Sequence, residues 1–425
     1  MIDSILFARE QKQFHIQKLL ENHDLVISIK SNIPGSHKNI VEAYLLVRLF
    51  HVELAKRFIF KRPMMMDTAD GPYDLIPLNQ GNLKDIKIQL IELEDTHPLG
   101  RFIDLDIHQQ MSQSISRADF GLPFRKCYLC ELDAHVCARN QTHDIQDLIS
   151  YVKDHISAYL SDTITKMIDL SMTMELDLDD KFGLVTKSSS GSHEDMDYQL
   201  MMKAKHVILP YLSRLFMKGY EAFEPEHLLE ESRPLGIEAE LEMLKVTGGI
   251  NCYKGLIFIL GLTVISSGYV LGHGMQFRDI FESVSVMTKD IFKEFESKSE
   301  TFGMEAYKTH QIKGARGEAY LGLPSVQKVM KSLFQVKMLK DIDLRETLRK
   351  LILESEDTVL LKRAGSMERY HEIKNILKSI DLNDPTDVKG FTLFSIQNSL
   401  SFGGSADLLV VSIYLYFIHQ TFFTI

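Results

Sequence analysis

The 425-residue chain lacks the features that mark secreted or disulfide-rich proteins. It has only four cysteines, and three of them fall between positions 127 and 137 instead of being spread out as in a disulfide framework. Its N-terminal segment shows neither the basic start nor the apolar stretch and cleavage site of a secretory signal. We therefore expect a cytoplasmic protein.

Long basic or apolar runs are also missing. The 48 basic and 58 acidic residues give a net charge of -10, which does not favour binding to nucleic acid or to an anionic membrane. The two most apolar stretches, Leu256–Leu271 and Leu408–Ile425, are interrupted by polar residues or glycine, whereas a membrane span needs about 20 apolar residues. We expect both to be buried core helices, and neither nucleic acid nor membrane as a partner.

Length and periodicity predict two domains. A chain this long, with 45% hydrophobic residues, exceeds one ordinary core. Alternation at Leu25–Lys30 and Ile86–Glu92 predicts strands, and the spacing of Ile40–Arg57 predicts a helix. The N-terminal domain is therefore expected to be α/β.

From about residue 144 onward the pattern is helical. The clearest examples are Glu238–Val246, Ser325–Leu339 and Leu344–Lys362. The second domain is therefore expected to be mostly all-α. We place the boundary in a helical stretch without a Pro/Gly linker, giving domains 1–153 and 154–425.

Two segments of the first half suggest phosphate chemistry. Between a predicted strand and helix, Asn32-Ile-Pro-Gly35-Ser-His-Lys38 is either a phosphate-binding turn or an ordinary Pro-Gly turn. In a strand, Asp104 and Asp106 share one face and could hold one Mg²⁺ ion, or they form a solvated face. Candidates for neutralising a leaving pyrophosphate are Arg101 and Arg117.

A cluster of soft ligands follows. Cys127, Cys130, Cys137 and His143 offer three thiolates and an imidazole within a short run, which suits a tetrahedral Zn²⁺ site. The spacing matches no standard zinc finger, so three reduced cysteines in a packed turn remain the alternative.

The second half has several polar segments in an apolar context. Asp195 and Asp197 open a predicted helix, where they either complement its dipole or take part in metal or nucleotide binding. Glycine-containing turns precede Lys254 and Arg316, which are candidate phosphate ligands, and tight interhelical turns are the alternative. We add Glu318 as a candidate catalytic carboxylate.

Two further carboxylates complete the candidates. Asp357 lies within an apolar helical stripe, so it needs a partner, such as Arg363 or a metal. Asp407 opens the last predicted helix, where it either caps the helix or joins Lys254, Arg316 and Asp357 in one polar pocket.

The motifs of the first half, taken together, point to a family. The segments NIPGSHK, HPLGRFIDLDI, Ser116-Arg117 and GLPFRKCYLC with AHVCARNQTH resemble the holo-citrate lyase acyl carrier protein synthase family. This resemblance implies transfer of a phosphoribosyl-dephospho-CoA group to a serine of the citrate lyase acyl carrier (gamma) subunit, with loss of pyrophosphate. It supports the metal interpretation of Asp104 and Asp106.

The second half resembles the triphosphoribosyl-dephospho-CoA synthase family. The resemblance is carried by GSHEDMDYQL, EMLKVTGGINCYKGLIFILGL, KGARGEAYLGLP, EDTVLLKRAG and GGSADLL, in this order. It implies that a ribose hydroxyl of 3′-dephospho-CoA attacks C1 of the ATP ribose and expels adenine, with Mg²⁺ as the expected cofactor. Both halves would then run consecutive steps, as in fused proteins of the CitXG type.

The chain departs from the second family at several positions. Asn251-Cys-Tyr-Lys-Gly255 stands where the family has Asn-Thr-His-Lys-Gly, and Asp357-Thr-Val359 stands for Asp-Thr-Asn. Tyr253 cannot replace imidazole as a base near neutral pH. An alternative is therefore that only the first half is active and the helical half is a degenerate nucleotide-binding scaffold. A related synthase serves malonate decarboxylase, but the fused transferase half favours citrate lyase.

Overall fold

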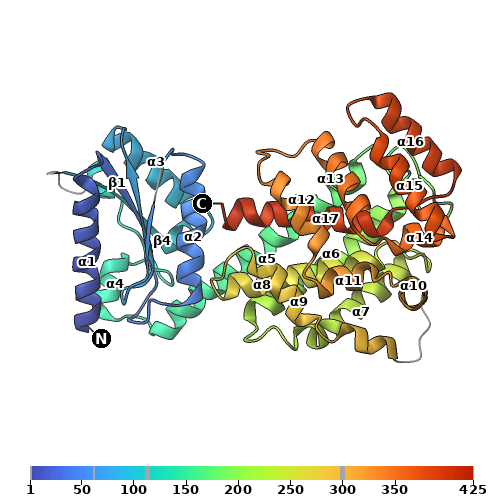
Figure 1. The fold of residues 1–425 in the computed structure, drawn as a ribbon. Helices are drawn as coiled ribbons and strands as arrows, with labels where there is room; N and C mark the ends of the chain where they lie inside the picture. Colours follow the sequence, from blue (N-terminus) through green and yellow to red (C-terminus); the bar gives the residue numbers. More distant parts are fainter. Residues whose placement is uncertain (1, 61–62, 111–114, 297–301, 425) are drawn as a thin grey trace. The chain divides into compact units, whose positions relative to one another are not determined.

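The computed structural model describes residues 2–60, 63–110, 115–296 and 302–424. The chain forms two compact units, Met1–Leu160 with Gln420–Ile425, and Ser161–His419. The first unit contains a small antiparallel sheet and the second consists mostly of helices (Figure 1), so the predicted α/β and mostly all-α classes are confirmed. Helix α5 (Ile145–Asp177) runs through the expected boundary at residues 153 and 154.

The sheet of the first unit has the strand order β2-β3-β1-β4, with antiparallel neighbours. Its strands are β1 (Leu25–Ser31), β2 (Met64–Met66), β3 (Tyr73–Leu78) and β4 (Ile103–Gln109). The strand predicted at Leu25–Lys30 is therefore confirmed.

Helices pack against both sides of this sheet (Figure 1). Helix α1 (Ile2–Leu20) places Ile16 and Leu20 in a core cluster with Val26, Tyr73 and Leu75. Helix α2 (Val41–Ala55), predicted at Ile40–Arg57, lies on the opposite face. Further elements are the 3₁₀ turns Gly100–Phe102 and Arg117–Phe120, and helix α4 (Ala134–Asn140).

The prediction of a strand at Ile86–Glu92 is wrong, because this segment lies in helix α3 (Leu83–Thr96). The side chain of Asn82 caps the helix by accepting hydrogen bonds from the backbone of Lys84 and Asp85. Buried positions 86, 87, 90, 91, 93 and 94 follow a helical period. In a window of seven residues the alternation of isoleucines with polar residues fitted a strand as well.

The second unit is a stack of helices around an apolar centre. Besides α5, its helices are α6 (Tyr198–Glu221), α7 (Leu228–Val246), α8 (Lys254–Gly272), α9 (Asp279–Met287), α10 (Phe302–His310), α11 (Gly314–Tyr320), α12 (Pro324–Leu333), α13 (Asp341–Glu354), α14 (Thr358–Ala364), α15 (Met367–Ser379), α16 (Pro385–Gln397) and α17 (Gly403–Phe422), with a 3₁₀ turn at Ile291–Glu296. The helix predicted at Ser325–Leu339 thus ends at Leu333.

Helix α8 is one of the two apolar stretches noted in the sequence. It is long and apolar enough to cross a membrane by length and composition, but 78% of its apolar window is buried inside the protein. It packs so closely on α6 that a side chain at Gly268 would collide with the carbonyl oxygen of Phe216. Glycine at this position is what allows the close approach. Residues Leu408–Tyr416 of the second stretch are also buried, in α17.

The single helix predicted at Leu344–Lys362 is two helices. Helix α13 ends at Glu354 and α14 begins at Thr358, with Asp357 as its N-cap. An N-cap residue has a non-helical backbone and bonds the free N–H groups of the first turn, which is why the helical pattern is interrupted here.

Candidate active sites in the two units

One candidate site of the first unit is the polar face of its sheet. In β4, Ile103, Leu105 and Ile107 are buried on one face, and Asp104 and Asp106 project from the other, as the alternation predicted. The same face carries Lys30 of β1, which pairs in register with Asp104.

Both carboxylates of this face have a cation beside them. Oδ1 of Asp104 lies 2.7 Å from the Arg125 guanidinium, and Oδ1 of Asp106 lies 3.0 Å from Nζ of Lys87. Burial raises the pKa of Asp104, although Arg125 opposes this. Burial also acts to raise the pKa of Asp106, but Lys87 together with Lys12 and His108 outweighs it, and the net shift is downward. Since these ion pairs use the Oδ1 atoms, the two Oδ2 atoms could hold Mg²⁺.

A second site of this unit is a cavity of about 940 Å³. Asn32 and Gly35 of the predicted phosphate-binding turn line it, together with Arg101. Nη1 and Nη2 of Arg101 are buried and have no hydrogen-bond partner among the described residues, while the guanidinium lies 5.0 Å from the ring of Tyr128. A buried cation without an acceptor is suited to an anionic ligand.

Two other cations predicted to bind phosphate are engaged within the protein. Nζ of Lys38 donates a hydrogen bond to the carbonyl of Ile33, inside its own turn. Arg117 forms ion pairs with Glu94 and Asp95, at 3.4 and 2.9 Å. Neither residue lines the cavity, so the structure separates them from Arg101.

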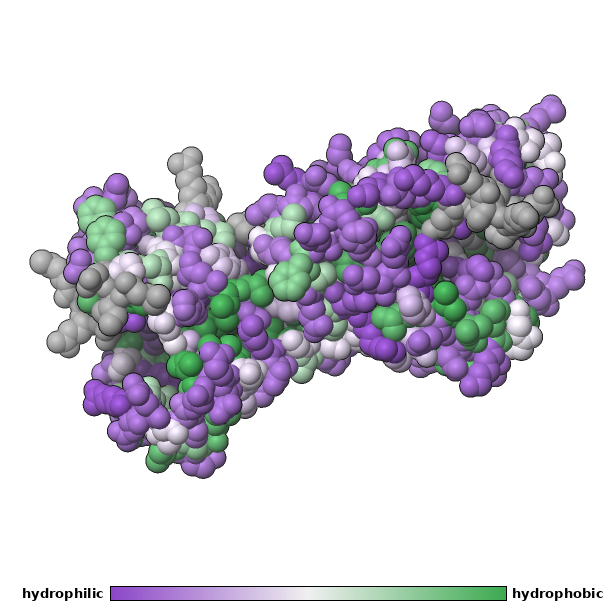
Figure 2. Space-filling view, turned by 90° about the horizontal axis from the view of Figure 1, so that it is seen from below, coloured by the Kyte–Doolittle hydropathy of each residue, from purple (hydrophilic) through white to green (hydrophobic). Residues whose placement is uncertain are grey.

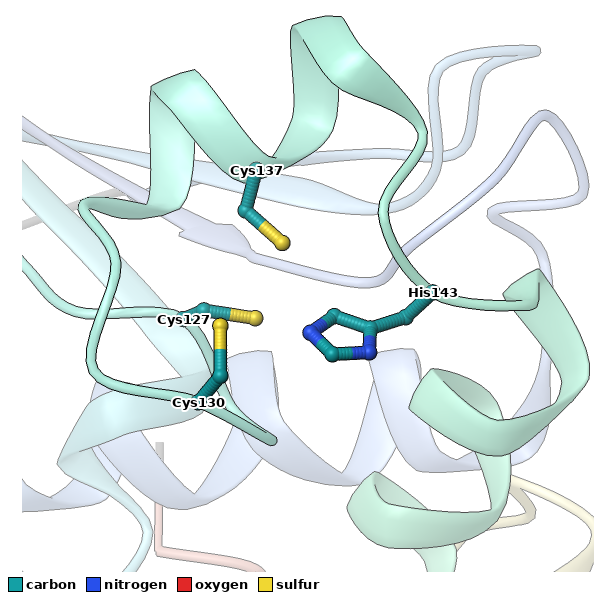
Figure 3. A group of neighbouring side chains, drawn as sticks. All are labelled: Cys127, Cys130, Cys137 and His143. Carbon is teal, nitrogen blue, oxygen red and sulfur yellow. The ribbon is translucent and has the colours of Figure 1, made fainter.

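The four soft ligands of the first unit come together as predicted from their spacing. The ligand atoms of Cys127, Cys130, Cys137 and His143 all lie within 4.8 Å of one another, and the side chains converge on one point (Figure 3). Nε2 of His143 is buried without a hydrogen-bond partner among the described residues. Three sulfurs and an unpaired imidazole nitrogen fit a closed tetrahedral Zn²⁺ site.

In the second unit, Lys254 and Arg316 line one cavity of about 350 Å³, as expected from their glycine-containing turns. Nζ of Lys254 forms an ion pair with Glu240, which lines the same cavity. Gly255, which lies against Asp407, and Thr358, which follows Asp357, also line this cavity.

Asp357 has its partners within the protein, and the suggested pairing with Arg363 is wrong. Oδ1 accepts hydrogen bonds from the backbone of Val359 and Leu360, at 2.9 and 3.1 Å. Oδ2 accepts from the backbone and the hydroxyl of Ser405, both at 2.8 Å. The charge is therefore balanced by the N-terminal turns of α14 and α17, and Asp357 fixes these two helices to each other.

Asp407 does not cap the last helix, because α17 already begins at Gly403. Its carboxylate lies against Gly255, where an added Cβ would be 2.4 Å from Oδ2. Burial raises the pKa of Asp407 well above its usual range, and the charges of Asp357 and Glu175 add to this rise. A carboxyl with a raised pKa beside a cavity is a candidate for proton transfer.

Tyr253 and Glu175, which interact electrostatically with Asp407, were not among the predicted site residues. The hydroxyl of Tyr253 is buried without a hydrogen-bond partner among the described residues, and burial raises its pKa well above 10, with Glu175 adding to the rise. Tyr253 is thus a neutral donor. Lys181, itself buried, holds Glu175 at 2.6 Å. The sequence signal that could have identified Glu175 is an acidic residue on the buried face of α5.

The remaining predicted residues lie at different places. Asp197 caps α6, as expected for a helix opening, by accepting from Leu200. Burial raises the pKa of Cys252 to about 11, and the nearby charges of Asp195 and Asp197 contribute. Glu318 instead accepts hydrogen bonds from the backbone and hydroxyl of Ser325 in the first turn of α12, and it does not line the cavity.

Comparison with known proteins agrees with this division. Residues 1–159 match the family of apo-citrate lyase phosphoribosyl-dephospho-CoA transferases (CitX), and residues 161–422 match the ATP:dephospho-CoA triphosphoribosyl transferases (CitG). The chain belongs to these two families, joined in tandem. It is a bifunctional transferase.

Two relatives named Protein CitXG match nearly the whole chain, and a third relative matches its second half. Protein CitXG of Leuconostoc mesenteroides subsp. cremoris is 28% identical over 97% of this chain and 96% of its own length. Protein CitXG of Haemophilus influenzae is 27% identical over 97% of this chain and 95% of its own length. A 2-(5''-triphosphoribosyl)-3'-dephosphocoenzyme-A synthase of Pectobacterium atrosepticum is 33% identical, covering 63% of this chain and 93% of its own length.

Proposed function

We propose that the second unit joins ATP to 3′-dephospho-CoA and that the first unit passes the product to the citrate lyase acyl carrier subunit. The product of the first step is 2′-(5″-triphosphoribosyl)-3′-dephospho-CoA, and adenine leaves. In the second step a carrier serine takes the phosphoribosyl-dephospho-CoA group and pyrophosphate leaves. Two observations carry this proposal: the buried guanidinium nitrogens of Arg101, which have no hydrogen-bond partner among the described residues, and the raised pKa of the Asp407 carboxyl.

In the helical unit the reaction needs one proton transfer. A bond forms between the 2′-oxygen of dephospho-CoA and C1 of the ATP ribose, the bond from C1 to N9 of adenine breaks, the hydroxyl proton is released, and the departing adenine takes up a proton. Asp407 accepts this proton when ionised, and its raised pKa makes it a stronger base than an ordinary carboxylate. Lys254 and Arg316, which line the cavity beside Asp407, bind phosphate oxygens of the two substrates.

In the sheet-containing unit the reaction is an attack on phosphorus. The carrier serine hydroxyl attacks the phosphorus nearest the ribose, and the bond to the leaving pyrophosphate breaks. Arg101 neutralises the charge that develops on the pyrophosphate. Oδ2 of Asp104 and Asp106 would hold Mg²⁺, which supplies further charge neutralisation when bound. Zn²⁺ at the Cys/His cluster would be structural, since all four positions are protein ligands.

The test uses purified full-length protein with ATP, dephospho-CoA, Mg²⁺ and apo-carrier, and the carrier is weighed by mass spectrometry. Wild type should add the full group. Arg101→Ala should still release adenine but transfer preformed donor about 10²-fold more slowly. Arg57→Ala, which removes an exposed arginine of the same unit, is the control.

The alternative of a degenerate helical unit predicts a different result. Wild-type protein would then release no adenine from ATP and dephospho-CoA, yet would modify the carrier when preformed donor is supplied. The substitution of tyrosine at position 253 in the family motif is the observation that permits this outcome.

A further inference from the structure

The cavity of the helical unit has two chemically different parts. Its walls are mostly aliphatic or aromatic, contributed by α6, α7, α8 and the 3₁₀ turn at Ile291: Leu215, Leu229, Ile237, Ile257, Phe258, Leu262, Ile265 and Ile291. Its charged side chains are Arg233, Glu240, Lys254, Lys313 and Arg316. The surface on the side of α7, α8 and α9 is otherwise mainly hydrophilic, with limited hydrophobic areas (Figure 2). Four cations around an apolar cavity suit an anion with an apolar extension.

One buried hydroxyl of the cavity wall has no hydrogen-bond partner in the part of the chain that the structure describes. Ser232 of α7 lines the cavity and is 4% exposed, and its hydroxyl makes no hydrogen bond to any described residue. A buried hydroxyl without a partner costs free energy, so such groups are usually satisfied by a ligand or water. The extension should therefore carry hydrogen-bonding groups along its length.

We propose that this cavity binds the pantetheine arm of dephospho-CoA, with the arm against the apolar walls, one of its amide or hydroxyl groups on Ser232, and its diphosphate on the surrounding cations. This assignment deepens the proposed function of the helical unit and rests on it. It makes Ser232 and Gly236 determinants of acceptor specificity.

The position of the reactive carboxyl favours the arm over the adenine of ATP. Adenine is bonded directly to the carbon under attack, so it has to lie next to the proton-transfer group. The arm is separated from the attacking 2′-oxygen by a ribose and a diphosphate. Asp407 does not line the cavity, and its carboxylate lies against Gly255 of the cavity wall. The reacting groups are thus expected beside the cavity and not within it, which leaves the cavity itself to the arm.

Filling the cavity tests this assignment. A Cβ at Gly236 would meet no atom within 4 Å, so Gly236→Leu can be accommodated by the backbone while its side chain occupies cavity space. Gly390→Leu in α16 is the matched control, since its Cβ also meets no atom and it lies outside the cavity. Ser232→Ala is paired with Ser283→Ala, which removes another buried hydroxyl without a partner.

The acceptors compared are dephospho-CoA and ADP, which is the same nucleotide without the arm. In wild type kcat/KM for dephospho-CoA should exceed that for ADP about 10²-fold or more, and Gly236→Leu should bring the two close together. Ser232→Ala should lower kcat/KM for dephospho-CoA by about tenfold and leave kcat/KM for ADP unchanged. The KM for ATP should stay within about twofold in both variants.

Equilibrium dialysis of dephospho-CoA without ATP separates this inference from the proposed reaction. Binding by wild type and its loss in Gly236→Leu would support the assignment even if no adenine were released. The assignment is overturned if wild type does not bind dephospho-CoA, if Gly236→Leu binds it as well as Gly390→Leu does, or if Gly236→Leu instead raises the KM for ATP.

Discussion

At the scale of single residues, Asp407 combines a functional position with a cost in stability. Its pKa is raised in the folded protein, so the folded state binds the proton more tightly than the unfolded chain, whose aspartate pKa is about 3.9. The resulting destabilisation is absent below about pH 4 and grows as pH rises from there toward the folded pKa.

Replacing this carboxyl should therefore stabilise the protein while removing its chemistry. Asp407→Asn should raise the melting temperature at pH 7.5, and the gain should shrink as pH falls toward about 4. Adenine release should be lost. Asp162→Asn, which breaks an exposed i,i+4 ion pair with Lys166, should change neither property measurably. A melting temperature lowered at pH 7.5 would contradict the buried, charge-repelled environment assigned to Asp407.

Gly255 is the second residue whose replacement is informative, because it leaves Asp407 chemically intact. An alanine Cβ would lie 2.4 Å from Oδ2, less than any normal contact, so the carboxyl has to move. A displacement of about 1 Å at a reacting group commonly costs about 10²-fold in rate. We expect this loss in adenine release for Gly255→Ala and none for Gly390→Ala, with both circular dichroism spectra unchanged. Equal rates would place Asp407 outside the reaction.

At the scale of elements, some local patterns were enough to predict secondary structure. The alternation in β4 correctly placed two aspartates on one face, and the spacing of Ile40–Arg57 predicted α2. The alternation at Ile86–Glu92 misled, because seven residues did not separate the strand period from the helix period. The break before Asp357 was missed because the aspartate also fitted the spacing of one continuous helix, although it is the N-cap of α14. Its bond to Ser405 arises from tertiary packing and leaves no local pattern.

Site residues could likewise be predicted where the signal is local in the sequence, and not where it depends on tertiary packing. Cys127, Cys130 and Cys137 were identified because these residues are close in the sequence, and their sulfur atoms are also close in space. The partner of Arg117 and the role of Glu318 could not be predicted, since Glu94 and Ser325 reach them through the fold. Sequence identifies which side chains carry chemistry, whereas burial and partners decide which of them are free to use it.

The Cys/His cluster is the element whose stability should depend on a ligand. It organises the segment from Cys127 to His143, which contains only one short helix. Purified protein should contain about one equivalent of zinc, and Cys130→Ser should lose it and make this segment sensitive to proteolysis. Cys252→Ser alters the one cysteine outside the cluster and should retain the metal. Elemental analysis that finds no zinc in wild type would instead indicate packed free thiols.

At the scale of the whole molecule, each compact unit has its own core and its own candidate site. The match to the first family ends at residue 159 and the match to the second begins at 161, next to the division between Leu160 and Ser161. Arg101 belongs to one unit and Arg316 to the other, so each substitution should disable one step only. The intermediate that links the steps is a small anionic molecule, which can leave one chain and bind another.

Two impaired variants should therefore complement each other in solution. Arg316→Ala alone should release no adenine, and Arg101→Ala alone should release adenine but modify the carrier about 10²-fold more slowly, because each lacks a cation that binds phosphate oxygens. An equimolar mixture, given ATP, dephospho-CoA, Mg²⁺ and apo-carrier, should restore the carrier mass gain. Its rate should rise with total protein concentration, since the intermediate has to diffuse between chains. Normal adenine release with no carrier modification in the mixture would mean that the intermediate passes only within one chain.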